Sequence, residues 1–347
     1  MASNNIKIHE HFKVVPPSSI QTTSIPLSFF DTFWLRFHPV ERIFFYTLPN
    51  SQSHPSFFFE KLVPKLKSSL SLTLKYLIPL AGNIVWHAES PNPIIQYTRN
   101  DGVSLLIAES NSNFSHVIEN SPHEASLSRS FIPHLESTDS FASIISLQIT
   151  IFPNSGFSIG ISTNHVVLDG KSITMFIKAW AYLCNKTNET KESPTLLLTT
   201  YVEQGYLVDT QSLDFIKEDG VFLVTKSIHD KIKMLNDKGL IEGLKDSASK
   251  YTSLSSEKVE YIGLVGSNRF GVYETDFGWG KPAKVEIVSI DRSLTIGLTE
   301  SKDGSGGVEV GLILNKNVMN LFSTLFREGL CINCDGIINQ LPYYIYR

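Results

Sequence analysis

The sequence is poor in cysteine, in dense positive charge and in long apolar runs, and each shortage excludes a class of protein. Three cysteines in 347 residues are too few for a secreted disulfide scaffold and suit a reducing compartment. Thirty Lys and Arg stand against 34 Asp and Glu without a basic run, so nucleic acid is not an expected partner. No apolar stretch has the length of a membrane span, and the first residues lack the apolar centre of a signal peptide. We therefore expect a cytoplasmic protein without membrane contact.

The length predicts two domains. A chain of 347 residues exceeds the size at which a single hydrophobic core stops growing. The stretch NKTNETKESP at 185–194 is polar, lacks periodicity and ends in proline, which is typical of an interdomain loop. It divides the chain into an N-terminal domain over residues 1–190 and a C-terminal domain over residues 200–347.

Apolar spacing predicts helices and strands on both sides of this loop. A four-residue spacing predicts a helix over 55–77, and a similar pattern predicts a helix over 171–184. Period-two alternation predicts two strands, 145–151 and 157–163, joined as a hairpin. Further elements are predicted in the second domain: a helix over 221–235, strands over 259–265, 284–290, 294–300 and 308–314, and a last helix over 315–328. This order predicts an α/β protein with mixed layers.

The strongest local pattern is STNHVVLDGKS at 162–172, in which His165 is followed at the fourth position by Asp169 and then by Gly170. If the strand from Phe157 continues to His165, its period of two turns the imidazole to the interior. A neutral imidazole near its ordinary pKa suits the removal of a proton from an alcohol, and the carboxylate can brace the loop. A buried, hydrogen-bonded histidine beside a capping aspartate is the alternative that this pattern leaves open.

Three other patterns favour a structural role over a catalytic or binding role. The run GFSIG at 156–160 matches the GxSxG of serine hydrolases, but Ser158 lies inside an alternating strand instead of at a strand-to-helix turn. The glycine-rich stretch 303–307 joins two strands, so a hairpin turn is expected there and not a phosphate site. Cys331 and Cys334 form a CxxC pair without a second pair or a histidine cluster, so no metal site is expected.

The stretch YETDFGWGKP at 273–282 is dense in glycine and aromatic residues and precedes a predicted strand. Its glycines supply turn geometry and its rings fill space between neighbouring elements. We therefore expect structural support from the five residues at its centre, which are Asp276, Phe277, Gly278, Trp279 and Gly280.

Taken together, NHVVLDGKS and DFGWGKP resemble the two signatures of the BAHD acyltransferases, in the order in which that family carries them. The segments PLSFFDTFWLRFHPVERIFFY, TLKYLIPLAGN and KVEIVSIDRSLTIGLTESKDGSGGVEVGLIL are similar to the branch that malonylates flavonoid, anthocyanin and other phenolic glucosides. The resemblance extends over residues 1–195 and 205–330. It implies two α/β domains like chloramphenicol acetyltransferase, with mixed sheets and a channel between them for acyl-CoA and acceptor.

This resemblance assigns roles to the residues. It implies that His165 deprotonates a sugar hydroxyl, which attacks the thioester carbonyl of malonyl-CoA without a covalent enzyme intermediate. It implies that Asp169 is structural and pairs with an arginine, and that the DFGWG loop shapes the second domain. Lys171 and Lys178 are candidates for binding the malonyl carboxylate. No metal or cofactor is expected, and the partners are acyl-CoA and a glycosylated phenolic acceptor, bound by a monomer.

The chain departs from the family in length, since family members are longer by roughly a hundred residues. The shortfall lies between the helix that ends near Cys184 and the segment GYLVDTQSLDFIKEDG. The resemblance implies that the missing part includes the crossover, the strand with the arginine that pairs with Asp169, and the YFGNC signature of the malonylating branch. We therefore expect an incomplete second domain with uncovered strand edges, low stability and a tendency to self-associate. The ending CINCDGIINQLPYYIYR also differs from the usual finish of the family.

Three interpretations follow from these patterns. The first is an O-acyltransferase that uses malonyl-CoA and a phenolic glucoside. The second keeps this chemistry but changes the acyl donor or the acceptor, and the third is a catalytically inactive family member that has lost its central segment. Condensation domains of peptide synthetases share the fold, but they carry paired histidines where this chain has Asn164 and His165.

Overall fold

The computed structural model describes most of the chain on both sides of its centre. The described residues are 6–17, 21–28, 31–32, 34–87, 89, 92–186, 226–227, 229–230, 233, 262–292, 294–333 and 344–346. The chain divides into a larger unit, Met1–Tyr201 with Ile262–Arg347, and a smaller one, Val202–Tyr261, in which the described residues are helical. Most of the predicted interdomain loop and of the helix over 221–235 lies outside the described residues, so the predicted domain boundary stays a prediction.

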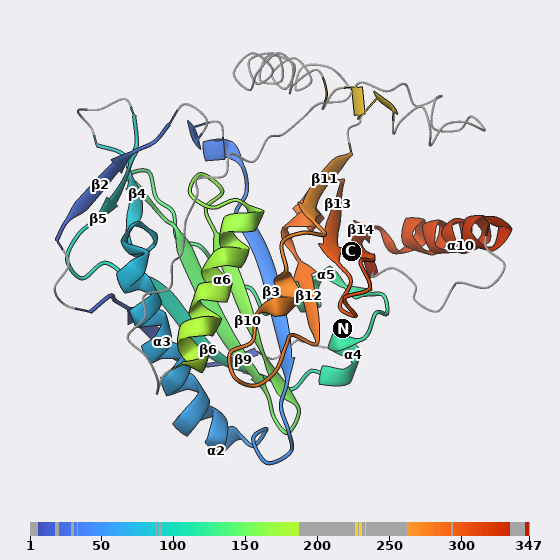
Figure 1. Cartoon of the computed structure of the whole chain (residues 1–347), viewed down its shortest axis with the longest axis horizontal. Helices are drawn as coiled ribbons and strands as arrows, with labels where there is room; N and C mark the ends of the chain where they lie inside the picture. Colours follow the sequence, from blue (N-terminus) through green and yellow to red (C-terminus); the bar gives the residue numbers. More distant parts are fainter. Residues whose placement is uncertain are drawn as a thin grey trace. The chain divides into compact units, whose positions relative to one another are not determined.

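A six-stranded sheet forms the centre of the larger unit, with the strand order β1-β6-β9-β10-β3-β12 (Figure 1). All neighbouring strands are antiparallel except β6 and β9, which are parallel. The bounds are β1 Ile6–Val14, β3 Val40–Thr47, β6 Val103–Ser110, β9 Ile145–Phe152, β10 Gly156–Thr163 and β12 Lys284–Ile287. The predicted hairpin is confirmed as β9 and β10. The strand predicted over 284–290 ends at Ile287, and its pairing with β3 completes the sheet from the far side of the chain.

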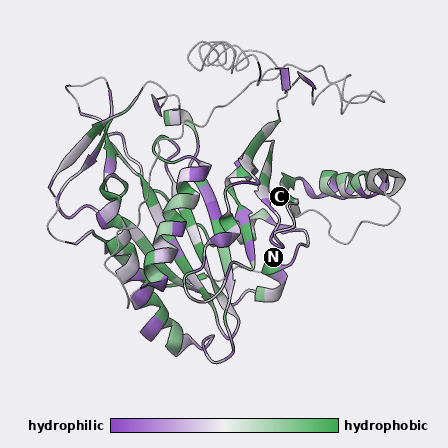
Figure 2. Ribbon diagram, in the orientation of Figure 1, coloured by the Kyte–Doolittle hydropathy of each residue, from purple (hydrophilic) through white to green (hydrophobic). Residues whose placement is uncertain are grey.

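Two helices cover one face of this sheet and bury its main core. The first begins as α2 (Pro55–Phe57), passes through a π-helical turn (Phe58–Leu62) and continues as α3 (Val63–Tyr76). The second is α6 (Gly170–Asn185). The apolar line predicted for the first helix is confirmed, because all its members are fully buried: Phe58, Leu62, Leu66, Leu70 and Leu74. Figure 2 shows that the strands beneath these helices are largely hydrophobic.

The opposite face of the sheet is covered closely by the chain around α4 (Phe114–Ile118) and α5 (Ala125–Arg129). A Cβ atom added to Gly160 of β10 would lie 1.9 Å from the carbonyl oxygen of Phe131, and one added to Gly156 would lie 2.7 Å from the Phe114 ring. Close packing therefore explains both glycines of the GxSxG match. Ser158 between them is buried within β10, as the structural interpretation predicts.

Two smaller sheets complete the larger unit. One has the order β11-β13-β14-β15-β7 and the other β2-β5-β4-β8. Their strands are β2 Thr23–Pro26, β4 Asn83–Val85, β5 Ile94–Tyr97, β7 His123–Glu124, β8 Phe141–Ser143, β11 Gly263–Ser267, β13 Thr295–Glu300, β14 Val308–Leu314 and β15 Tyr344–Tyr346. The glycine-rich stretch 303–307 joins antiparallel β13 and β14, which confirms the predicted hairpin turn. The run predicted over 259–265 is β11, displaced toward the C-terminus, and 259–261 lie outside the described residues.

The last helix, α10 (Lys316–Asn333), is confirmed, and hydrophobic residues lie along the part of it that Figure 2 colours. Val318, Leu321 and Leu325 are each at least half exposed, and Leu264 of β11 is 62% exposed. Such uncovered apolar surface is uncommon in a complete monomeric domain and fits an incomplete second domain. None of the described helices combines the length and the apolar character needed to cross a bilayer.

Candidate active site

His165 lies in the turn that joins β10 to α6. Strand β10 ends at Thr163, so the strand does not continue to the histidine, contrary to the condition used in the sequence analysis. Asn164 organises the turn instead. Its side-chain oxygen accepts a hydrogen bond from the Val166 N–H at 3.1 Å, and its carbonyl oxygen accepts from the Leu168 N–H at 3.2 Å. The position of the imidazole is therefore set by this turn and not by strand parity.

Two aromatic side chains flank the His165 ring. The indole of Trp34, on the 3₁₀ helix η1 (Trp34–Arg36), stacks on the imidazole with ring centroids 4.2 Å apart and planes 14° from parallel. Phe37 meets the imidazole edge-on, at 6.4 Å and 69°. Neither residue was predicted from the sequence. Their only signal is the aromatic density of FFDTFWLRF, and nothing in that run points to a histidine so distant in the sequence.

The surroundings of His165 keep its imidazole neutral. Burial lowers the pKa of the His165 side chain below its ordinary value, and the negative charge of Asp169 partly opposes this shift. A half-buried, neutral imidazole can accept a proton at physiological pH. Among the described residues, no group of three or more His, Cys, Asp or Glu side chains is placed to hold a metal ion.

Asp169 caps helix α6. Its Oδ1 accepts a hydrogen bond from the Ser172 N–H at 2.6 Å, which satisfies one of the free donors at the start of the helix. Its Oδ2 is buried and has no hydrogen-bond partner among the described residues. The family resemblance implies an arginine partner for this carboxylate, and that partner stays a prediction.

The capping role gives a stability prediction for Asp169. Asp169→Ala removes the capping oxygen and is expected to destabilise the protein by about 0.5–2 kcal/mol. Asp169→Asn keeps such an oxygen and is expected to retain the wild-type melting temperature, measured by circular dichroism. If Asn and Ala destabilise the protein equally, the charge of Asp169 and not its cap holds the loop.

The two candidate lysines occupy different turns of α6. Lys171 lies in the first turn, and Lys178 follows about 10 Å further along the helix axis, given a rise of about 1.5 Å per residue. The ammonium of Lys178 donates to Glu274 Oε2 at 2.6 Å, and this hydrogen bond lowers the pKa of the Glu274 carboxyl. Lys178 therefore already has a carboxylate partner, whereas Lys171 is the nearer of the two to His165 in the chain.

The DFGWG residues form a turn that is held by hydrogen bonds between its own residues. Asp276 Oδ1 accepts hydrogen bonds from the N–H groups of Gly278, at 2.7 Å, and Gly280, at 3.0 Å. The φ angles of Gly278 and Gly280 are 100° and 97°, a region that strongly favours glycine. The turn geometry predicted for these glycines is thus present.

The two rings of this turn pack onto the N-terminal part of the chain. Phe277 is fully buried and meets the rings of Trp180, at 4.9 Å, and Tyr46, at 5.7 Å, both edge-on. Trp279 meets Phe157 of β10 edge-on at 6.0 Å. This packing supports the structural role predicted for the motif.

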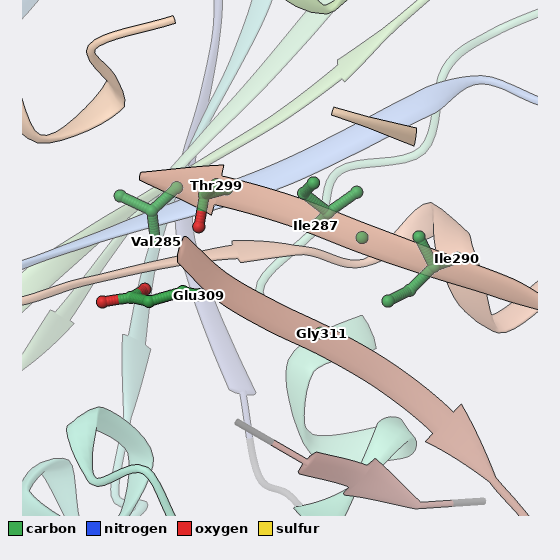
Figure 3. A pocket seen from close by; sticks show the side chains of 7 residues that line it. Val285, Ile287, Ile290, Thr299, Glu309 and Gly311 are labelled. Atoms are coloured by element: carbon green, nitrogen blue, oxygen red, sulfur yellow. The ribbon is translucent and has the colours of Figure 1, made fainter. Parts of the chain in front are cut away.

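A separate hollow lies between β12 and the β13–β14 hairpin (Figure 3). Its lining residues are Val285, Ile287, Ile290, Gly297, Thr299, Glu309 and Gly311. The Glu309 carboxylate there accepts a hydrogen bond from the Tyr273 hydroxyl at 2.7 Å. None of the site residues predicted from the sequence lines this hollow, so the candidate site stays at the His165 turn.

The sequence matches the model of the Transferase family over residues 4–204 and 201–328, which is most of the chain. This chain belongs to the BAHD acyltransferase family. It is therefore an acyltransferase, as its two motifs predict. The two family matches meet at residues 201–204, inside the stretch where the shortfall is predicted.

Two relatives from Arabidopsis thaliana are similar over nearly the whole of their length. The chain is 30% identical to phenolic glucoside malonyltransferase 1, over 94% of this chain and 98% of the relative. It is 31% identical to malonyl-CoA:anthocyanidin 5-O-glucoside-6''-O-malonyltransferase, again over 94% and 98%. The alignment with phenolic glucoside malonyltransferase 1 spans 464 positions, whereas this chain has 347 residues. This confirms the prediction that the chain is shorter than its relatives.

The crystal structure of vinorine synthase has a similar fold. Its TM-score is 0.59 at 18% sequence identity, covering 88% of this chain and 94% of vinorine synthase. At this identity the likeness concerns the fold alone. It confirms the predicted α/β class with mixed sheets and domains like chloramphenicol acetyltransferase.

Proposed function

We propose that the chain transfers a malonyl group from malonyl-CoA to a sugar hydroxyl of a phenolic or flavonoid glucoside, with His165 as the general base. The observation that carries this proposal is the half-buried, neutral imidazole at the HxxxD turn of a BAHD acyltransferase. The similarity to two malonyltransferases that are named for glucoside acceptors supports the choice of donor and acceptor.

The reaction needs one base and no covalent intermediate. The His165 imidazole accepts the proton of the sugar hydroxyl as the oxygen attacks the thioester carbonyl, which gives a tetrahedral oxyanion. Collapse of the oxyanion breaks the carbon–sulfur bond and forms the ester. The CoA sulfur leaves as a thiolate and takes the proton back from the imidazolium. The products are the malonylated glucoside and free CoA, and His165 is neutral again.

Other residues take supporting roles in this proposal. Asp169 holds the turn through its cap on α6, and the DFGWG loop shapes the fold around Phe277. Lys171 and Lys178 are the candidates for the malonyl carboxylate, which an ammonium can bind as a point charge. The chemistry uses acyl-CoA as a co-substrate, and a cytoplasmic monomer is the expected form of the enzyme.

A transfer assay tests the proposal. The purified protein is incubated with malonyl-CoA and a panel of flavonoid and simple phenolic glucosides, with the matching aglycones as controls. Malonylated glucoside and free CoA are expected in equal amounts, and no product is expected from the aglycones. A preference for acetyl-CoA or coumaroyl-CoA would reassign the donor. A folded protein that transfers no acyl group from any donor would establish the inactive family member instead.

A further inference from the structure

The His165 ring has a close partner that the proposed reaction does not use. Trp34 lies nearly parallel to the imidazole at 4.2 Å, while Phe37 closes one edge of the ring. Both come from the segment around η1, before β3, whereas His165 belongs to the turn after β10. The ring is therefore held by two parts of the chain that are far apart in sequence.

A base on a turn needs such support. The hydrogen bonds of Asn164 act on the backbone of the turn and not on the imidazole ring itself. A general base must bring one ring nitrogen within hydrogen-bond distance of the hydroxyl, along a defined direction. Stacking on a flat indole restricts rotation of the imidazole out of the stacked plane.

We propose that Trp34 is a positioning residue for the general base, which holds the His165 imidazole in the orientation that accepts the acceptor's hydroxyl proton. This inference rests on the proposed function, in which His165 is the base. Trp34 itself exchanges no proton in the reaction, because an indole N–H is a donor only. Its contribution is orientation, and the loss of orientation lowers the rate of the chemical step.

The kinetic test replaces the indole by two side chains of different shape. Trp34→Leu keeps apolar volume but loses the flat ring, and it is expected to lower kcat about a hundredfold with little change in KM for either substrate. Trp34→Phe keeps a flat ring and is expected to recover most of the lost kcat. Trp86→Leu is the matched control, because Trp86 is a half-buried tryptophan directly after β4 that packs against the same core, and it should keep the wild-type kcat. Equal losses in the Leu and Phe variants, or a rise in KM alone, would overturn the positioning role.

A second test detects the contact without any turnover. A protonated imidazole quenches the emission of an indole that it touches, so tryptophan fluorescence of the wild type should fall as acid protonates His165. Among the described residues, the groups that face this ring include the uncharged Trp34 and Phe37 from the η1 segment and the Asp169 carboxylate at α6. The fall should disappear in Trp34→Phe and in His165→Gln and persist in Trp86→Leu.

The two tests separate the two ways in which the inference can fail. If the wild type and His165→Gln show the same fluorescence change with pH, the stack does not exist in solution and the inference is overturned whatever the transfer assay shows. If the quenching depends on both residues but the wild type transfers no acyl group, the proposed function has failed, and Trp34 has no base to position.

Discussion

Replacing His165 by alanine is expected to lower kcat for malonyl transfer by about 10²–10⁴-fold, the usual contribution of a general base. The melting temperature should stay close to that of the wild type, because the ring is only half-buried and the turn is held by Asn164. The measurement is steady-state transfer to a glucoside acceptor beside a thermal melt. His9→Gln is the matched control, since His9 lies on β1 and bonds to Glu109 instead of facing the site. A His165→Ala variant with near-normal kcat would remove the base from the mechanism.

The pH dependence gives an independent check on His165. The base works when it is neutral, and burial lowers its pKa below the ordinary value of about 6.5. Activity should therefore be constant above this value and fall on the acid side, with a midpoint of kcat/KM below pH 6.5. A midpoint above the ordinary imidazole value would mean that a different group, or a less buried histidine, accepts the proton.

Gly160→Ala, in strand β10, is expected to destabilise the protein strongly. The new Cβ would lie 1.9 Å from the carbonyl oxygen of Phe131, so the backbone around Phe131 or strand β10 must move. Forced movement of this kind costs about 1–3 kcal/mol. A lower melting temperature and a smaller yield of folded protein are the expected results, both measured against the wild type.

The neighbouring serine supplies the control for that experiment. Ser158 is two residues before Gly160 on the same face of β10, and its hydroxyl is buried without a hydrogen-bond partner among the described residues. Ser158→Ala removes an unsatisfied polar group and should leave the melting temperature unchanged or raise it. A stable Gly160→Ala variant would show that the segment at Phe131 can move away from the sheet.

The elements with a clear apolar period were predictable from the sequence. The line of residues from Phe58 to Leu74 is buried along one helix face, and the β9–β10 hairpin and α6 have nearly the predicted bounds. These patterns suffice because each depends on neighbours within a few turns or strands. The two motifs were sufficient for the family, since their order along the chain is itself specific.

The contacts between distant segments could not be predicted in this way. The stack of Trp34 on His165 depends on the folded path of two turns, and neither turn carries a periodic signal. The pairing of β12 with β3 could not be predicted from the sequence either, because the pattern of a four-residue strand does not specify which strand it pairs with. The strand parity used for His165 failed for a related reason, since β10 ends at Thr163 and a turn determines the ring's direction.

The position of β12 in the six-stranded sheet has a consequence for folding during synthesis on the ribosome. Strand β3 ends at Thr47, whereas its neighbour β12 begins at Lys284, so the nascent chain cannot close this sheet until synthesis has passed Ile287. Pairing of such distant segments is slow, and an open edge invites aggregation while it lasts. For most of its synthesis the polypeptide therefore carries an edge of β3 that waits for its last partner strand.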